Sequence, residues 1–266
     1  MIRTITVYTG HNEYAIAAHA HAIEMAKQFG ARLKVVNVWE AEKGGMLEAS
    51  NESASDVMHG NLEDIMAAAA RSGVRVDEGV RGNGMVRGLP EEARETDLLV
   101  LGLPTDEDRN RTDEGDHLVR KERSVLRKVD CALLLVNRPP APIRKILALY
   151  EDSSSGKSML RMVAAIAERY GAKLGLLTIE NNLARAMALS ASAAEYVKGF
   201  DIPAVEQLAQ DGPTGSKVSI LEEADAFDAD LIAMGEEGHN WLERFFGENL
   251  AERTALSTSI PLLLVR

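Results

Sequence analysis

The sequence is poor in cysteine, in aromatic side chains and in long apolar runs. Its 266 residues include a single cysteine, Cys131, so no disulfide can form within the chain. The apolar residues that follow Cys131 predict a buried free thiol, and a reducing cytoplasm is the expected compartment. No apolar run reaches the roughly 20 residues that a membrane-spanning helix needs. Residues 2–8 alternate like a strand, so we expect no signal peptide.

Basic residues are also scarce relative to acidic ones. The chain has 30 Lys and Arg against 41 Asp and Glu, a net charge of −11. This surplus of negative charge disfavours nucleic acid and anionic membrane surfaces as partners. With 45% hydrophobic residues, the chain has enough apolar material for folded cores.

Strand-like and helix-like segments alternate along the chain. In the first half we predict strands at 2–9, 33–39, 74–80, 97–102 and 131–136, with helices at 13–29, 56–71, 89–95 and 117–128. Gly30 and Gly73 are placed to end two of these helices. Arg138-Pro-Pro-Ala-Pro142 then predicts a stiff linker, after which a strand at 145–150 and a helix at 155–170 restart the pattern.

The second half repeats the first. Residues 29–33 recur as 170–174, 97–102 as 230–235 and 133–137 as 262–266, at slowly shrinking separations. Such a pattern is typical of a duplication with loop deletions in the second copy. We therefore predict two domains of one fold, at residues 1–140 and 141–266.

Strands that alternate with helices predict a parallel sheet with helices on both faces. In such sheets, ligands bind beyond the carboxyl ends of the strands, where the strand order reverses. The candidate site in the second half is therefore the loop after Tyr150 together with the loop after Met234. Gly235 and Gly238 open this second loop and would expose backbone N–H groups to an anion.

The repeat and its glycines resemble the universal stress protein family in its tandem, two-domain form. The resemblance implies two five-stranded domains of the adenine nucleotide alpha hydrolase-like fold, with strand order 3-2-1-4-5. It also implies ATP or AMP as ligand, with Mg²⁺ as an optional companion, in a cytoplasmic stress-response protein.

The family's nucleotide motif is Gly-x2-Gly-x9-Gly-Ser/Thr, and an aspartate ends its first strand. The second half keeps Gly235 and Gly238, has Gly247 one position early, and has Asn249 in place of the Ser or Thr. Glu151 falls at the aspartate position. The resemblance implies nucleotide contacts from Tyr150, Glu151, Asp152, Ile179, Met234, Gly235, Gly238, Gly247, Asn249 and Leu250.

Two departures from the motif matter. Glu236, Glu237 and Glu248 put carboxylates beside the expected phosphates, and a like charge about 4 Å away costs roughly 1 kcal/mol in water. A divalent cation would offset this repulsion. In the first half, Thr9 stands at the aspartate position and only Gly102 of the glycines remains. We expect that half to have lost nucleotide binding.

Other motifs are weaker. Residues 153–158, Ser-Ser-Ser-Gly-Lys-Ser, end like a P-loop, but Glu151 stands where that motif needs glycine, so a serine N-cap is expected. Lys157 and the first turn of that helix could still attract an anion. Asp106 begins a calcium-like loop that has Arg111 in place of glycine. His19 and His21 are expected at the surface, not as metal ligands, and no catalytic set of residues is apparent.

Two functions from different classes remain open. The first is regulatory binding of an adenine nucleotide in the second domain, with at most slow hydrolysis. The alternative is a nucleotide-free module for dimerisation or partner binding. The apolar final strands, Leu133–Val136 and Leu262–Val265, are expected pairing edges for a homodimer or an intrachain pseudo-dimer.

Overall fold

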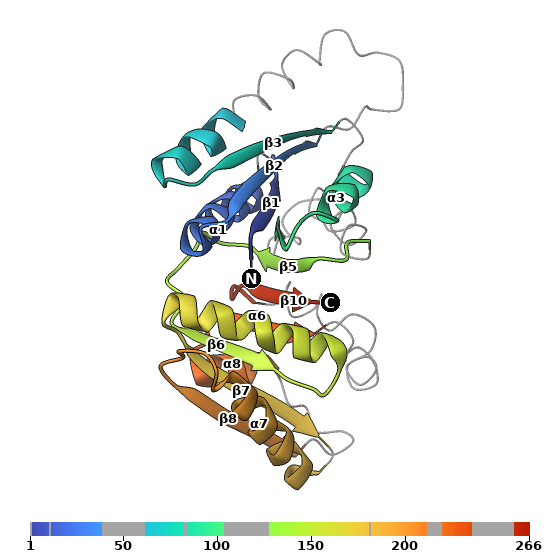
Figure 1. The fold of residues 1–266 in the computed structure, drawn as a ribbon, viewed down its shortest axis with the longest axis vertical. Coiled ribbons are helices and arrows are strands. Elements are labelled where there is room, and N and C mark those ends of the chain that lie inside the picture. Colours follow the sequence, from blue (N-terminus) through green and yellow to red (C-terminus); the bar gives the residue numbers. More distant parts are fainter. Residues whose placement is uncertain are drawn as a thin grey trace. The chain divides into compact units, whose positions relative to one another are not determined.

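The computed structural model describes residues 2–10, 12–38, 62–81, 85–103, 128–180, 182–211, 220–235 and 258–266 (Figure 1). The chain divides into two compact units, residues 2–140 and 141–266. Both units are α/β, and every pairing between neighbouring strands within each unit is parallel.

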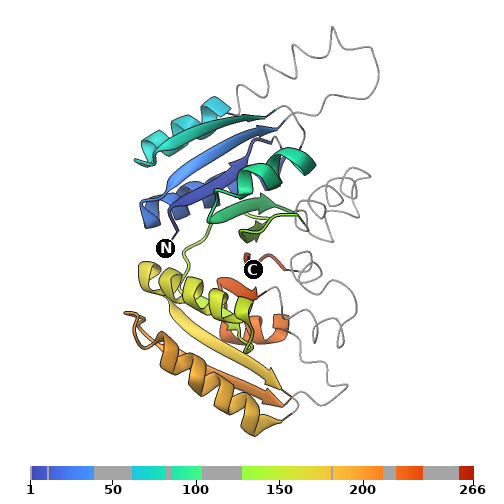
Figure 2. The ribbon, with the colours of Figure 1, turned by 45° about the vertical axis from the view of Figure 1, so that its right-hand side comes forward.

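The first unit is a five-stranded sheet in the order β3-β2-β1-β4-β5. Its strands are β1 (Thr4–Tyr8), β2 (Arg32–Val38), β3 (Val76–Arg81), β4 (Leu98–Gly102) and β5 (Ala132–Val136). Helix α1 (Glu13–Phe29) packs on one face and α3 (Met85–Ala93) on the other (Figure 2), and residues 62–71 are also helical.

The second unit repeats this order as β8-β7-β6-β9-β10. Its strands are β6 (Lys145–Leu149), β7 (Lys173–Glu180), β8 (Val205–Asp211), β9 (Leu231–Gly235) and β10 (Leu262–Val265). Helices α6 (Ser154–Tyr170) and α7 (Leu183–Val197) cover one face, and α8 (Ile220–Phe227) covers the other (Figure 2). The predicted parallel sheets with strand order 3-2-1-4-5 are confirmed.

Local signals set the ends of the long helices. Asn12 caps α1 by accepting a hydrogen bond from the backbone of Ala15, and Ser153 caps α6 in the same way. Gly30 and Gly171 end these helices with φ of 62° and 61°, a left-handed conformation that favours glycine. The predicted serine N-cap and glycine helix end are therefore confirmed.

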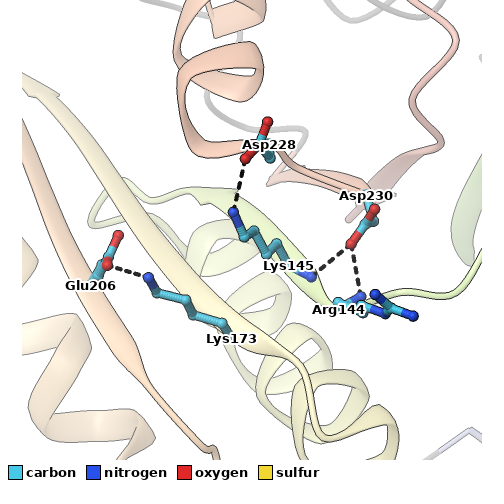
Figure 3. Close-up of polar contacts among 6 residues, drawn as sticks. All are labelled: Arg144, Lys145, Lys173, Glu206, Asp228 and Asp230. Atoms are coloured by element: carbon cyan, nitrogen blue, oxygen red, sulfur yellow. Dashed lines mark hydrogen bonds and ion pairs between the residues drawn. The ribbon is translucent and has the colours of Figure 1, made fainter.

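Each unit has an equivalent aspartate that links two central strands of its sheet. The carboxylate of Asp97 accepts hydrogen bonds from the backbone N–H groups of Arg3 and Thr4, at 2.7 and 2.9 Å. In the second unit Asp230 does the same for Arg144 and Lys145, at 2.8 and 2.9 Å (Figure 3). Each carboxylate joins the start of one central strand to the start of its neighbour.

The interiors of the two units differ beside the sheet. In the first unit Thr6 donates to Thr96, whose hydroxyl donates to the Glu92 carbonyl, and the Glu92 carboxylate pairs with Lys34. The repeat puts Leu147, Gly175 and Ala229 in the places of Thr6, Lys34 and Thr96. The ring of Phe227 packs against Gly175 instead. A paired polar cluster in one unit is thus replaced by apolar packing in the other.

No element is predicted between residues 171 and 229, where the structure has β7, α7, β8 and α8. Helix α7 has only two charged residues, Arg185 and Glu195, so its pattern shows little contrast between buried and exposed faces. Strand β8 is a polar edge strand, VEQLAQD, and lacks the apolar alternation that identifies a strand.

The expectation that His19 and His21 lie at the surface is wrong. Their side chains are 7% and 4% exposed, because residues on both flanks of α1 are buried. His19 Nε2 lies 2.9 Å from the Tyr8 carbonyl, and His21 Nε2 lies 3.1 Å from the Arg138 carbonyl. Both rings therefore satisfy backbone carbonyls, one at the end of β1 and one just beyond β5.

The single thiol behaves as expected, since Cys131 is buried and free. Within the described part of the chain, no helix combines the length and the apolarity that crossing a bilayer requires.

Replacing Asp230 by Asn should lower the free energy of unfolding by about 1–2 kcal/mol, because two charge-assisted hydrogen bonds become weaker or are lost. Denaturant titration of the variant measures this loss. Asp97→Asn is the matched change in the first unit and should cost a similar amount. Unchanged stability in both variants would contradict the fastening role.

Stability should also fall in acid through His21. Burial lowers the pKa of this imidazole from 6.5 to about 4, although the bond to the Arg138 carbonyl acts in the opposite direction. Between pH 6.5 and 4 the unfolded chain therefore binds a proton at His21 that the folded chain does not bind. This difference lowers the free energy of unfolding by roughly 3 kcal/mol at pH 4.

The measurement is the difference in unfolding free energy between the wild type and His21→Gln at pH 7 and at pH 4.5. Gln can donate to the same carbonyl and does not titrate. The variant should lose less stability on acidification than the wild type, and parallel losses would rule out His21 as the source.

Candidate functional site

The strand order reverses between β6 and β9, which are neighbours in the second unit. Leu149 pairs with Met234 at the carboxyl ends of these two strands. The chain leaves β6 through residues 150–153 and enters α6, whose N-terminus lies at this same edge. The predicted elements of the site, the segment after Tyr150 and the end of β9, are therefore adjacent.

Gly235 brings the backbone of β9 unusually close to α6. A Cβ atom at Gly235 would lie 2.8 Å from Gly156 N and from Ser155 Oγ, and 2.9 Å from the Ser155 carbonyl carbon. Real Cβ atoms do not approach other atoms so closely, so only glycine fits without displacing the helix. The end of the strand thus lies against the first turn of the helix.

Ser153 organises the turn between β6 and α6. Its hydroxyl accepts from Gly156 N at 2.9 Å and donates to the Glu151 carboxylate at 3.2 Å. Ser155 Oγ lies 3.3 Å from Ser153 Oγ. A Cβ at Gly156 would lie 2.2 Å from the Glu151 carbonyl oxygen, so the turn folds tightly on itself. The bond from Ser153 therefore holds the Glu151 carboxylate at the N-terminus of α6.

Three more ionisable groups surround this turn. Asp152 Oδ1 lies 2.8 Å from Lys157 Nζ, and both side chains are exposed. The hydrogen bond and the negative charge of Asp152 raise the pKa of Lys157, so this ammonium stays charged. Burial, followed by the charge of Asp152, raises the pKa of the Tyr150 phenol, while Lys157 acts to lower it.

Strand β7 extends beyond β6 at the same edge. The last bond between the two strands runs from Tyr150 N to the Leu177 carbonyl, whereas β7 continues to Glu180. Residues two apart in a strand point their backbone N–H and C=O groups to the same side. Leu177 points these groups toward β6, so Ile179 does too. Thr178 is buried, and its hydroxyl donates to the Ala186 carbonyl in α7.

The register of the first unit corrects one sequence-based assignment. Thr9 N donates to the Val36 carbonyl just as Tyr150 N donates to that of Leu177. The N-caps Asn12 and Ser153 follow three residues later in each case. Thr9 is therefore equivalent to Tyr150, and the residue in the place of Glu151 is Gly10. The prediction that Thr9 holds the aspartate position is wrong by one residue.

The first unit nevertheless keeps the backbone geometry. A Cβ at Gly102 would lie 2.1 Å from the Tyr14 carbonyl oxygen and 2.9 Å from Ala15 N, which repeats the contact of Gly235 with α6. The chemistry around that contact differs, because Gly10 supplies no carboxylate where Glu151 does. The two units thus share this backbone packing and differ in the side chains around it.

Six of the ten predicted site residues can be located in the structure. Tyr150, Glu151, Asp152, Ile179, Met234 and Gly235 all lie at the carboxyl edge of the second sheet, and Tyr150 and Met234 are buried. The remaining predicted residues, Gly238, Gly247, Asn249 and Leu250, lie outside the described residues, as do Glu236, Glu237, Glu248 and the loop that begins at Asp106.

Ser155 and Gly156 are not among the ten predicted site residues, although the sequence indicates that the first turn of their helix could attract an anion. Their place in the first turn of a helix that follows a central strand is the signal that identifies them. Among the described residues, no group of three or more His, Cys, Asp or Glu side chains is arranged to hold a metal ion.

Comparison with known proteins decides the family. The universal stress protein family matches residues 1–137 and 215–266, which is more than half of the chain. The chain belongs to the universal stress protein family. No curated protein is matched by the chain.

Solved structures support the fold of this family member along its whole length. A universal stress protein from Archaeoglobus fulgidus DSM 4304 is 12% identical with a TM-score of 0.72, over 98% of this chain and 95% of that one. A protein of unknown function from Pseudomonas aeruginosa PAO1 is 18% identical with a TM-score of 0.59, over 99% and 92%. The cytoplasmic domain of a prokaryotic cation chloride cotransporter is 16% identical with a TM-score of 0.57, over 100% and 95%.

Gly235→Ala and Gly102→Ala should each lower the free energy of unfolding by about 1–3 kcal/mol, because the added methyl group collides with helix backbone. Thermal and denaturant unfolding measure the loss. Gly199→Ala is a control, since a Cβ there meets no atom within 4 Å. A stability for Gly235→Ala equal to that of Gly199→Ala would contradict the close approach.

Proposed function

We propose that this universal stress protein binds an adenine nucleotide, ATP or AMP, at the carboxyl ends of β6 and β9 in its second unit. The observation that carries the proposal is the approach of Gly235 to the first turn of α6. A strand end packed against a helix N-terminus gathers backbone N–H groups and the positive helix end at one point. Phosphate is the ligand group that this arrangement favours.

Each part of the nucleotide has a proposed partner. The Glu151 carboxylate accepts from the ribose hydroxyls, and the backbone of Ile179 meets the adenine edge. The backbone after Met234, at Gly235 and Gly238, approaches the phosphates. Gly247, Asn249 and Leu250 complete the phosphate loop, and Mg²⁺ offsets the nearby glutamates.

We assign the nucleotide a regulatory role in a stress response, in the cytoplasm. No general base is identified, so hydrolysis is at most slow. The first unit serves as a structural partner, since it has glycine in place of Glu151 and, after Gly102, lacks the second glycine of the motif.

A second candidate is a nucleotide-free interaction module. Helix α7 exposes three large apolar side chains: Leu183, Met187 and Tyr196 are 46%, 57% and 47% exposed. Exposed apolar surface favours contact with another protein. The likeness to a cotransporter's cytoplasmic domain illustrates that one fold can serve different functions. Pairing through the final strands, in a homodimer or within the chain, stays a prediction.

Calorimetric titration with Mg-ATP and with AMP tests the first candidate, together with analysis of any nucleotide released when the purified protein is heat-denatured. The wild type should bind at least one of the two nucleotides. Glu151→Gln should weaken binding roughly tenfold, because a neutral acceptor replaces a charged one at the ribose.

Glu13→Gln is the matched control. It removes one negative charge from the start of α1, the helix of the first unit that corresponds to α6. This variant should bind as the wild type does. If the wild type releases no nucleotide and shows no heat of binding, the proposal fails and the interaction module is favoured.

A further inference from the structure

The first turns of the two equivalent helices carry opposite charge, although the carboxylates of Glu151 and Asp152 lie just before α6. The first turn of α1 contains Glu13, and its fourth residue is Ile16. The first turn of α6 contains no acidic residue, and its fourth residue is Lys157. Both helices are 17 residues long and both are capped by a polar side chain. The two helices are thus alike in length and differ in the charge of their first turns.

A lysine near a helix N-terminus breaks a local rule. The N-terminal end of a helix carries about half a positive charge, so an acidic residue such as Glu13 stabilises it and a cation is unfavourable. Natural proteins break such rules mainly at functional sites. In α6 the unfavourable charge is offset by Asp152, whose carboxylate lies 2.8 Å from Lys157 Nζ.

The Asp152–Lys157 pair is open to exchange. The two side chains are 57% and 61% exposed, and ion pairs in water contribute little net free energy. Lys157 also follows Gly156 directly, and Gly156 N is the group that Gly235 approaches. The ammonium therefore extends from the same turn that the backbone of β9 meets.

We propose that Lys157 is the residue that reads phosphate charge at this site, and that Asp152 is an internal competitor that holds the ammonium until a nucleotide arrives. The inference rests on the proposed function and names its specificity. On binding, Lys157 exchanges one carboxylate for the phosphate chain. Asp152 then sets a threshold: ligands with more phosphate charge displace it more readily, so ATP is favoured over AMP.

Four variants test this proposal by calorimetry with ATP and with AMP, each with and without Mg²⁺ and at two salt concentrations. Lys157→Met should weaken ATP binding roughly tenfold, with a smaller effect on AMP, because a charge-assisted contact is lost. Lys157→Arg should retain the preference for ATP. Asp152→Asn should strengthen ATP binding and Asp152→Ala should do the same.

Lys173 and Glu206 provide the matched controls. They form an ion pair at the amino ends of β7 and β8 (Figure 3). Seven residue steps along β7 separate Lys173 from Glu180 at the carboxyl end, roughly 23 Å at 3.3 Å per residue, whereas charges are screened within about 8 Å at physiological salt. Lys173→Met and Glu206→Gln make the same changes in net charge and should leave both affinities unaltered.

The outcomes separate the two proposals. If the wild type binds nucleotide, and Lys157→Met alters ATP affinity no more than Lys173→Met does, the role of Lys157 is wrong while nucleotide binding stands. The competitor role is wrong if Asp152→Asn leaves ATP affinity unchanged or weakens it. If neither the wild type nor Asp152→Asn binds ATP or AMP, both the site and this inference fail.

Discussion

The contact between a strand end and a helix start is the constraint on which the rest of this structure depends. Gly235 and Gly102 each bring the backbone of the fourth strand of their unit against the first turn of the first helix. A side chain at either position would push the helix away from the sheet. Since the contact involves backbone, it leaves the surrounding side chains free to vary, and they differ between the two units.

This division between backbone and side chains explains how the duplicated halves have diverged. Asp97 and Asp230 make the same pair of backbone hydrogen bonds, and Gly30 and Gly171 end equivalent helices. Around these shared supports, the first unit contains buried histidines and a Lys34–Glu92 pair. The second unit has Glu151 and the cation Lys157 at the N-terminus of α6. The charged groups beside the first helix therefore differ between the two units, while the backbone supports are shared.

Most of the architecture could be predicted because its signals are local and repeated. Helix α1 begins and ends where its cap residues predict, and the buried strands β4 and β9 are continuous apolar runs. Helix α7 and strand β8 gave weaker signals. The helix is apolar on several sides, and the edge strand has polar residues on both of its faces. Burial of His19 and His21 could not be predicted from a two-residue spacing, because both flanks of α1 are covered.

By itself, the sequence determined the class of fold, the internal repeat and the strand that ends at the candidate site. These features follow from periodicity and glycine positions, which are properties of neighbouring residues. Only the tertiary structure decided which residues meet across the chain. It placed Ser155 and Gly156 against Gly235, and it moved the counterpart of Glu151 from Thr9 to Gly10. Such equivalences depend on hydrogen bonds between strands that are distant in sequence, and no local pattern encodes them.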